Sequence, residues 1–196
     1  MQLKDPEAEM RLQVKVFSRM EKAARNPENI YRRFLEFEER AAAVYLRFAS
    51  HFPQDPRLSS FWLEMALQEK QHAGLLQFCL HEGLFASGLP DSDEIRKVNA
   101  LFERLEKHAA DPSLSVEDAF SLAIELETSE VNTIYCHLTS TLHGSMYLLK
   151  RNIATSLPRH VEELLESAKK FGVGNHALKE LDRLKKRWSS QKDEVR

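Results

Sequence analysis

Apolar residues recur at helical spacing along most of the chain. The clearest patterns span 27–51 and 57–82, where apolar positions follow one another in alternating steps of three and four residues. Such steps place side chains on one face of an α-helix. Asn26-Pro27 is a good helix start, Pro53 and Pro56 stop the first pattern, and Gly83 or Gly88 ends the second. Both stretches are predicted to be long helices of a bundle.

Less regular patterns predict the remaining helices. Residues 91–109 begin at a capping box, Asp91 with Glu94, and look like a crossover between two halves. Another helix starts at Ser115, and a further one runs from about 145 to 170. Pro158 lies inside that last segment, so we expect a kink there or a helix that restarts at Ser156.

Amphipathic segments flank this central region at both ends. The pattern over 6–24 predicts a helix that docks on the main body or on a second subunit, and the basic pattern over 176–189 predicts docking against the bundle or a neighbouring subunit. We therefore expect an all-α chain with three parts: an N-terminal helical arm (1–26), a helical bundle (27–172) and a basic amphipathic tail (173–196).

Charged residues interrupt the apolar faces of the predicted helices. Glu69 and His72 are three residues apart, so a carboxylate and an imidazole point from one helical face, an arrangement suited to a metal ion between packed helices. By itself this pair is a weak signal, but the other apolar faces carry similar residues. The full set of candidate metal ligands is Glu38, Glu69, His72, Glu127, Glu130 and His160.

Composition and charge restrict the classes of protein to consider. The 196 residues include six Gly and seven Pro, which favours helix, and the net charge of −2 gives no reason to expect a nucleic-acid partner. Cys79 and Cys136 form no C-x-x-C pair, so no zinc ribbon or rubredoxin-type iron site is expected. No apolar run is long enough for a membrane span, and the charged N-terminal residues argue against a secretory signal. A soluble, cytoplasmic protein is expected.

The two halves of the predicted bundle align with each other. Glu38 precedes Glu69 by 31 residues and Glu127 precedes Leu157 by 30, while His72 and His160 each follow three residues later. Duplication of a helix pair is the simplest explanation.

These motifs resemble the ferritin-like proteins, and within them the rubrerythrin branch. The run from Glu38 to Tyr45 is similar to the first rubrerythrin helix, Glu69-x-x-His72 to its bridging glutamate and nearby histidine, and Glu127-x-x-Glu130 to its paired glutamates. His160 stands where the last histidine ligand is expected. The resemblance implies a ferritin-like four-helix bundle with a long crossover that contains a short helix.

The same resemblance implies a function. It predicts two iron ions bound by the six candidate ligands, with Tyr45 hydrogen-bonded to a ligand carboxylate. The expected activity is that of a non-haem di-iron peroxidase or oxidase, or of a ferroxidase that oxidises ferrous iron. Electrons would come from an external donor, because the chain has too few cysteines for a rubredoxin domain. A homodimer is expected, with the terminal helices as candidate contacts.

Departures from the rubrerythrin pattern leave alternatives open. Leu157, followed by Pro158, replaces the second bridging glutamate, and Ile134 replaces a tyrosine. Binding of one ion, or of manganese or zinc, is therefore a second hypothesis, and a non-catalytic helical scaffold with weak or no metal binding is a third. In the third case Glu127 and Glu130 reach solvent or pair with Arg or Lys, and His160 is a hydrogen-bonded core residue.

Overall fold

A computed structural model of the chain describes residues 26–86, 89–129, 147–174, 178–183 and 186, with the backbone alone from 147 to 158. Every regular element in these ranges is a helix, as expected for an all-α chain. None of the described helices combines the length and the apolar character that crossing a membrane requires. The main elements are α2 (Pro27–His51), α3 (Pro56–Glu82), α4 (Ser92–Ala109), α5 (Val116–Thr128) and α7 (Tyr147–Lys170).

Local capping sets the helix ends. The Asn26 side chain accepts a hydrogen bond from the backbone N–H of Glu28, and Gly83 ends α3 with a left-handed φ of 65°. The predicted capping box of Asp91 and Glu94 is present at the start of α4. Pro56 does not merely stop α2. Because the Asp55 side chain caps the next helix, this proline occupies the first position of α3.

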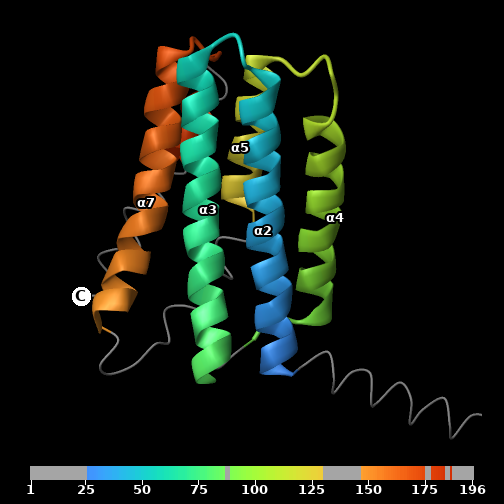
Figure 1. The fold of residues 1–196 in the computed structure, drawn as a ribbon, viewed down its shortest axis with the longest axis vertical. Coiled ribbons are helices and arrows are strands. Elements are labelled where there is room, and N and C mark those ends of the chain that lie inside the picture. Colours follow the sequence, from blue (N-terminus) through green and yellow to red (C-terminus); the bar gives the residue numbers. More distant parts are fainter. Residues whose placement is uncertain (1–25, 87–88, 130–146, 175–177, 184–185, 187–196) are drawn as a thin grey trace, which may run out of the picture.

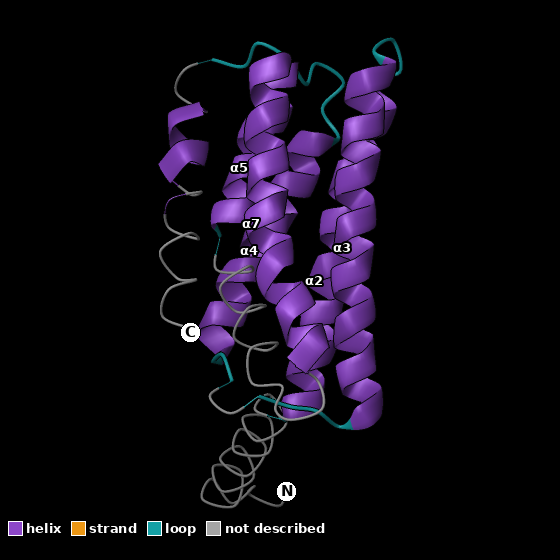
Figure 2. Ribbon diagram, turned by 90° about the vertical axis from the view of Figure 1, so that its left-hand side faces the viewer, coloured by secondary structure: helices purple, strands orange, loops and turns teal. Residues whose placement is uncertain are grey.

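The helices run along one axis and are connected at the two ends (Figures 1 and 2). α2 and α3 are antiparallel neighbours, and α5 runs in the same direction as α3 (Figure 1). The Phe61 ring of α3 stacks on the Phe120 ring of α5 at 5.6 Å, and Phe120 in turn contacts Phe171, just beyond α7. The chain must therefore cross the length of the bundle between α3 and α5.

That crossing is made by α4, which packs along the outside of α2 (Figure 1). Phe102 of α4 stacks on Phe37 of α2 with ring centroids 5.4 Å apart. Arg40 donates two hydrogen bonds to the Glu106 carboxylate, at 2.7 and 2.9 Å, and its guanidinium lies 5.0 Å from the Phe102 ring. The sequence predicts this crossover segment over 91–109, and apolar and charged contacts to α2 support a helix of 18 residues there.

The predicted apolar faces form the core. On α2 and α3 every member of the predicted faces is buried, including the charged ones: Phe34, Glu38, Ala41, Tyr45 and Phe48, and Leu58, Trp62, Met65, Glu69, His72, Leu76 and Cys79. The largest buried side chain is Trp62, which lies among Tyr45, Phe48, Phe61 and Phe120. These rings fill one end of the bundle and exclude water from the polar residues beyond them.

Two further expectations concern the C-terminal region. Residues 147–170 form one continuous helix, so the expected restart at Ser156 is wrong. A proline removes one intrahelical hydrogen bond, and the turns on either side retain theirs. Residues 178–183 are helical and Leu181 is buried, which confirms for this part of the tail that it docks on the bundle. The N-terminal arm lies outside the described residues.

Candidate metal centre

Five of the six candidate ligands meet inside the bundle. They come from four helices: Glu38 from α2, Glu69 and His72 from α3, Glu127 from α5 and His160 from α7. None of them is more than 5% exposed. The helical period explains this convergence, because each residue belongs to the apolar face that its helix turns toward the core. Glu130 lies outside the described residues.

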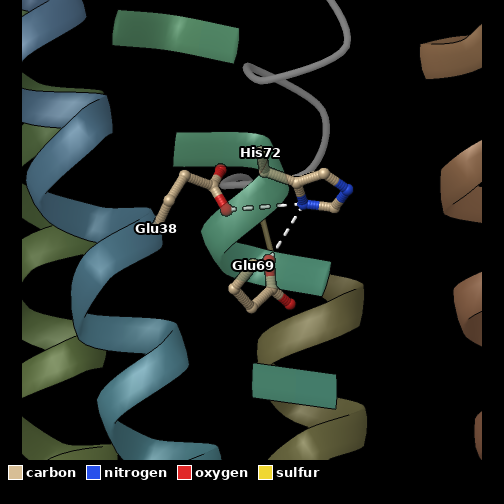
Figure 3. A group of neighbouring side chains, drawn as sticks. All are labelled: Glu38, Glu69 and His72. Atoms are coloured by element: carbon tan, nitrogen blue, oxygen red, sulfur yellow. Dashed lines mark hydrogen bonds and ion pairs between the residues drawn. The ribbon is translucent and has the colours of Figure 1, made fainter. Parts of the chain in front are cut away.

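The first ligand group joins α2 to α3. The Nδ1 atom of His72 lies 2.9 Å from Oε2 of Glu69 and 3.6 Å from Oε2 of Glu38. Figure 3 shows the Glu38 and Glu69 carboxylates on one side of the His72 ring, both directed at that nitrogen. One donor atom from each of the three residues lies within 4.8 Å of the others, so a single ion could contact all three.

The second ligand group joins α3 to α5 and α7. Oε1 of Glu69 lies 3.6 Å from Nε2 of His160, and Oε2 of Glu127 lies 3.7 Å from Nδ1 of the same ring. These three residues also offer donor atoms within 4.8 Å of one another.

Glu69 belongs to both groups, and its two oxygens face different histidines. Oε2 is close to His72 of the first group, and Oε1 is close to His160 of the second. A carboxylate placed in this way can bind one ion through each oxygen. The geometry therefore fits two ions on either side of Glu69.

Several polar atoms of the cluster lack hydrogen-bond partners among the described residues. They are Oε1 of Glu38 and both ring nitrogens of His160, all buried. A buried polar atom without a partner costs about 1–3 kcal/mol, so native structures rarely leave such atoms unmatched. A bound cation would satisfy the Glu38 oxygen and one nitrogen of His160, and carboxylate and imidazole donors suit iron, manganese or zinc. The described residues thus fit a metal ion.

The cluster also perturbs its own protonation. Burial raises the pKa of the Glu38 carboxyl to about 8, although His72 opposes the rise. Burial would lower the pKa of His72, but hydrogen bonds and charge from Glu38 and Glu69 raise it to about 10. Burial would raise the pKa of Glu69, but His160 and His72 lower it to about 2. Near neutral pH, protons on Glu38 and His72 balance part of the negative charge.

Tyr45 supports the second group. Its hydroxyl donates a 2.7 Å hydrogen bond to Oε1 of Glu127, a carboxylate partner that the sequence left unspecified. Burial and the charges of Glu127 and Glu69 raise the pKa of Tyr45 well above its ordinary value, so the hydroxyl remains a donor. The Tyr45 ring also stacks on Trp62 at 5.8 Å. The sequence showed Trp62 only as a member of the apolar face, two turns before Glu69.

These contacts bear on the metal-free alternatives. Glu127 is 2% exposed, so its carboxylate does not reach solvent. His160 is buried, and among the described residues its ring nitrogens approach the carboxylates of Glu69 and Glu127 at 3.6 and 3.7 Å without a hydrogen bond. The backbone places residue 157 one turn before His160 on α7. Its leucine side chain and Ile134 lie outside what the structure describes.

No family model, curated protein or solved structure matches the chain.

Proposed function

We propose that the chain is a rubrerythrin-like metal protein that holds two transition-metal ions, most simply iron, in the centre of a helical bundle. The observation that carries this proposal is the pair of ligand groups that share Glu69. Such a sharing arrangement needs four helices to place their charged residues at one depth, and a solvated or structural role does not require it. One ion would lie with Glu38 and His72, the other with Glu127 and His160.

The helix arrangement supports a ferritin-like bundle. In such bundles four helices surround the metals, and one long crossover connects the second to the third. Here α3 and α5 run in the same direction, and the chain between them follows the bundle through α4 (Figure 1). Glu-x-x-His from α3 and inward carboxylates from α2 and α5 are the residues that this class of site uses.

The proposed activity is an oxidoreductase reaction with peroxide or oxygen, or the oxidation of ferrous iron as substrate. Bound iron supplies the redox chemistry, and the protein supplies binding and orientation. Glu69 would contribute a carboxylate oxygen to each ion, and Tyr45 orients Glu127 through its hydroxyl. The aromatic residues around Trp62 keep water out at one end. For peroxide or oxygen reduction, a separate donor must deliver electrons.

Metal analysis tests the binding part of the proposal. Protein produced with iron should carry about two ions per chain, and Glu69→Ala should carry none. Glu64→Ala is the matched control, because Glu64 is exposed on the same helix and outside both groups. A wild-type metal content near zero, with thermal stability unchanged by Fe(II), Mn(II) or Zn(II), would overturn the proposal.

Turnover is tested separately on the metal-loaded protein. Stopped-flow absorbance should show oxidation of the ferrous protein by hydrogen peroxide or by oxygen at rates well above those of the metal-free protein mixed with free Fe(II). Equal rates would leave metal binding intact and contradict the oxidoreductase assignment.

A second candidate function is a non-catalytic scaffold. The observation that favours it is the 2.9 Å contact between His72 and Glu69, which balances charge in the first group without a metal. The replacement of a bridging glutamate by Leu157 points the same way. This candidate predicts a protein that is fully folded without metal and does not react with peroxide in any metal-loaded form.

A further inference from the structure

The outward face of α3 carries large exposed apolar side chains. Leu63, Leu67 and Phe78 are 46%, 54% and 40% exposed. With 3.6 residues per turn, these positions and Gly74 follow one another along a single line of the helix, opposite to the buried Glu69. Single exposed leucines are ordinary on protein surfaces, but three large apolar side chains on one helix face, interrupted only at Lys70, Gln71 and Gly74, are not. We call Leu63, Leu67, Gly74 and Phe78 the α3 stripe.

Gly74 is the second observation. It lies in the middle of α3, where glycine costs about 1 kcal/mol relative to alanine. A Cβ at this position would meet no atom within 4 Å, and its φ is not positive, unlike those of Gly83 and Gly172. Nothing among the described residues therefore requires a glycine here. The missing side chain leaves a gap in the stripe that a large side chain from another molecule can fill.

The neighbouring face of α2 extends this apolar surface. Ser59 on α3 donates a hydrogen bond to the backbone of Ala49 on α2, and this antiparallel register places the 42% exposed Leu46 beside Leu63. Lys70 lies on the same side of α3 and forms an ion pair with Glu39 of α2. The charge in the middle of the stripe is thus neutralised within the chain.

We propose that the α3 stripe is the contact surface of a homodimer, in which the α3 helices of two copies pack antiparallel across a two-fold axis between Lys70 and Gln71. An antiparallel pair with this axis puts Leu67 of each copy over Gly74 of the other. It also puts Leu63 against Phe78. A two-fold contact must be complementary to itself. In the stripe, the large Leu67 faces the gap at Gly74, and the apolar Leu63 faces the apolar Phe78.

Charge complementarity also favours a second copy as the occupant. The two Lys70 ammonium groups come near the axis, where unpaired like charges would repel. Each is already paired with Glu39 of its own chain, and the four charges can alternate in sign across the axis. The proposal does not depend on metal binding, since the stripe faces away from the ligand groups.

Solution mass is the first test. In sedimentation or light-scattering measurements the wild-type chain should have twice the 22.7 kDa monomer mass. The double variant Leu63→Glu/Leu67→Glu should sediment as a monomer with unchanged helicity, because it places four charges in an apolar contact. Ala100→Glu, an exposed change on α4, is the control and should remain dimeric. A monomeric wild type overturns the proposal, and so does a double variant that stays dimeric.

Disulfide trapping tests the register. Residues 67 and 74 of one helix lie about 10 Å apart along its axis, too far for a disulfide within the chain. In a Cys136→Ser background, Leu67→Cys/Gly74→Cys should therefore form covalent dimers under mild oxidation. Each single cysteine variant should form far fewer, because identical positions are offset across the axis. Equal trapping by either single variant, or none by the double variant, would contradict this arrangement.

Discussion

The group of Glu38, Glu69 and His72 lies within the antiparallel pair α2 and α3, whereas the group of Glu69, Glu127 and His160 draws on α3, α5 and α7. In the first group, His72 contacts Glu69 at 2.9 Å. In the second, the closest described contacts of His160 to the carboxylates are 3.6 and 3.7 Å, beyond hydrogen-bonding distance.

This difference shows which buried polar groups are paired by folding alone and which are left without a hydrogen bond among the described residues. A protonated His72 balances the charge of Glu69 in the first group, so burial of that carboxylate needs no metal. His160 is positioned by α7 packing and has no hydrogen-bond partner among the described residues. The first group should therefore contribute to the stability of the metal-free protein, and the second should depend on a cation for its polar contacts.

Removal of Glu69 should have the largest effect, because this residue alone belongs to both groups. Glu69→Ala should reduce the metal content from two ions per chain to none. It should also destabilise the metal-free protein by about 3 kcal/mol, since His72 loses its partner in a buried site. Metal analysis and urea unfolding measure the two effects. Retention of one tightly bound ion would show that the groups act independently and would contradict a bridging role for Glu69.

Matched leucine variants of the two histidines break the comparison most directly. Without metal, His72→Leu should destabilise the protein by about 3 kcal/mol, because the Glu69 carboxylate is left buried beside a leucine. His160→Leu should destabilise it less, by about 1–2 kcal/mol, because the ring that helps to lower the pKa of Glu69 contacts the carboxylates only at 3.6 and 3.7 Å and makes no hydrogen bond among the described residues. Each variant should lose one bound ion. Equal stability losses in urea unfolding would contradict the proposed difference between the groups.

The helices were more predictable from sequence than the contacts between them. Caps and prolines act over a few residues, so Pro27–His51 was predicted to the residue, and the helical period identified the buried faces correctly. The sequence predicts that Pro56 helps to end the first long helix, whereas in the structure it is the first residue of α3. Prolines occur both after the end of a helix and in the first turn of the next one, so the residue type alone does not separate the two. Periodicity indicates on which face of its own helix a residue lies, but it does not indicate the relative depth and rotation of neighbouring helices.

The site shows the same limit. Burial of Glu38, Glu127 and His160 followed from their places on apolar faces. The division of the two Glu69 oxygens between different histidines depends on how α7 packs against α3, and no local pattern contains it. The expected hydrogen bond from Tyr45 to a ligand carboxylate is present, but its partner, Glu127, lies 82 positions away, and sequence spacing could not identify it for the same reason.

A pH titration sharpens the description of the first group. The pKa of Glu38 is raised from 4.5 to about 8 and that of His72 from 6.5 to about 10, so the folded state binds these protons more tightly than the unfolded state. The stability they contribute is complete below the unfolded values and is lost as pH rises through about 8 and 10. The metal-free protein should therefore unfold at lower urea concentrations as pH increases above neutrality.

Metal binding should show the opposite trend. Zn(II) or Mn(II) must displace the protons on Glu38 and His72, so its apparent affinity should rise with pH over the same window. When metal is added to the metal-free protein in unbuffered solution, proton release should lower the measured pH. His72→Leu should weaken the pH dependence of stability and that of metal affinity. Tyr31→Phe, a change at a tyrosine of α2 that contacts Ala86 and not the ligand groups, should leave both unchanged. A pH-independent affinity would mean that neither group is protonated before the metal binds.

The smallest effect on metal binding should come from Tyr45→Phe. The change keeps the ring stacked on Trp62 and removes only the hydroxyl that donates to Glu127. Loss of a buried hydrogen bond to a carboxylate should destabilise the protein by about 2 kcal/mol. Because the hydroxyl orients a ligand, affinity at the second group should fall about 10-fold, with two ions still bound at saturation.

Tyr31→Phe provides the control for this last comparison. The Tyr31 hydroxyl also comes from α2 and is also buried, but it accepts a hydrogen bond from the backbone N–H of Ala86, away from both ligand groups. This variant should lose stability without any change in metal affinity. If both tyrosine variants weaken metal binding equally, the effect arises from general loosening of α2. If only Tyr45→Phe weakens metal binding, and only for the ion of the second group, the hydroxyl acts through Glu127. Metal affinity at the second group then depends on the Tyr45 hydroxyl.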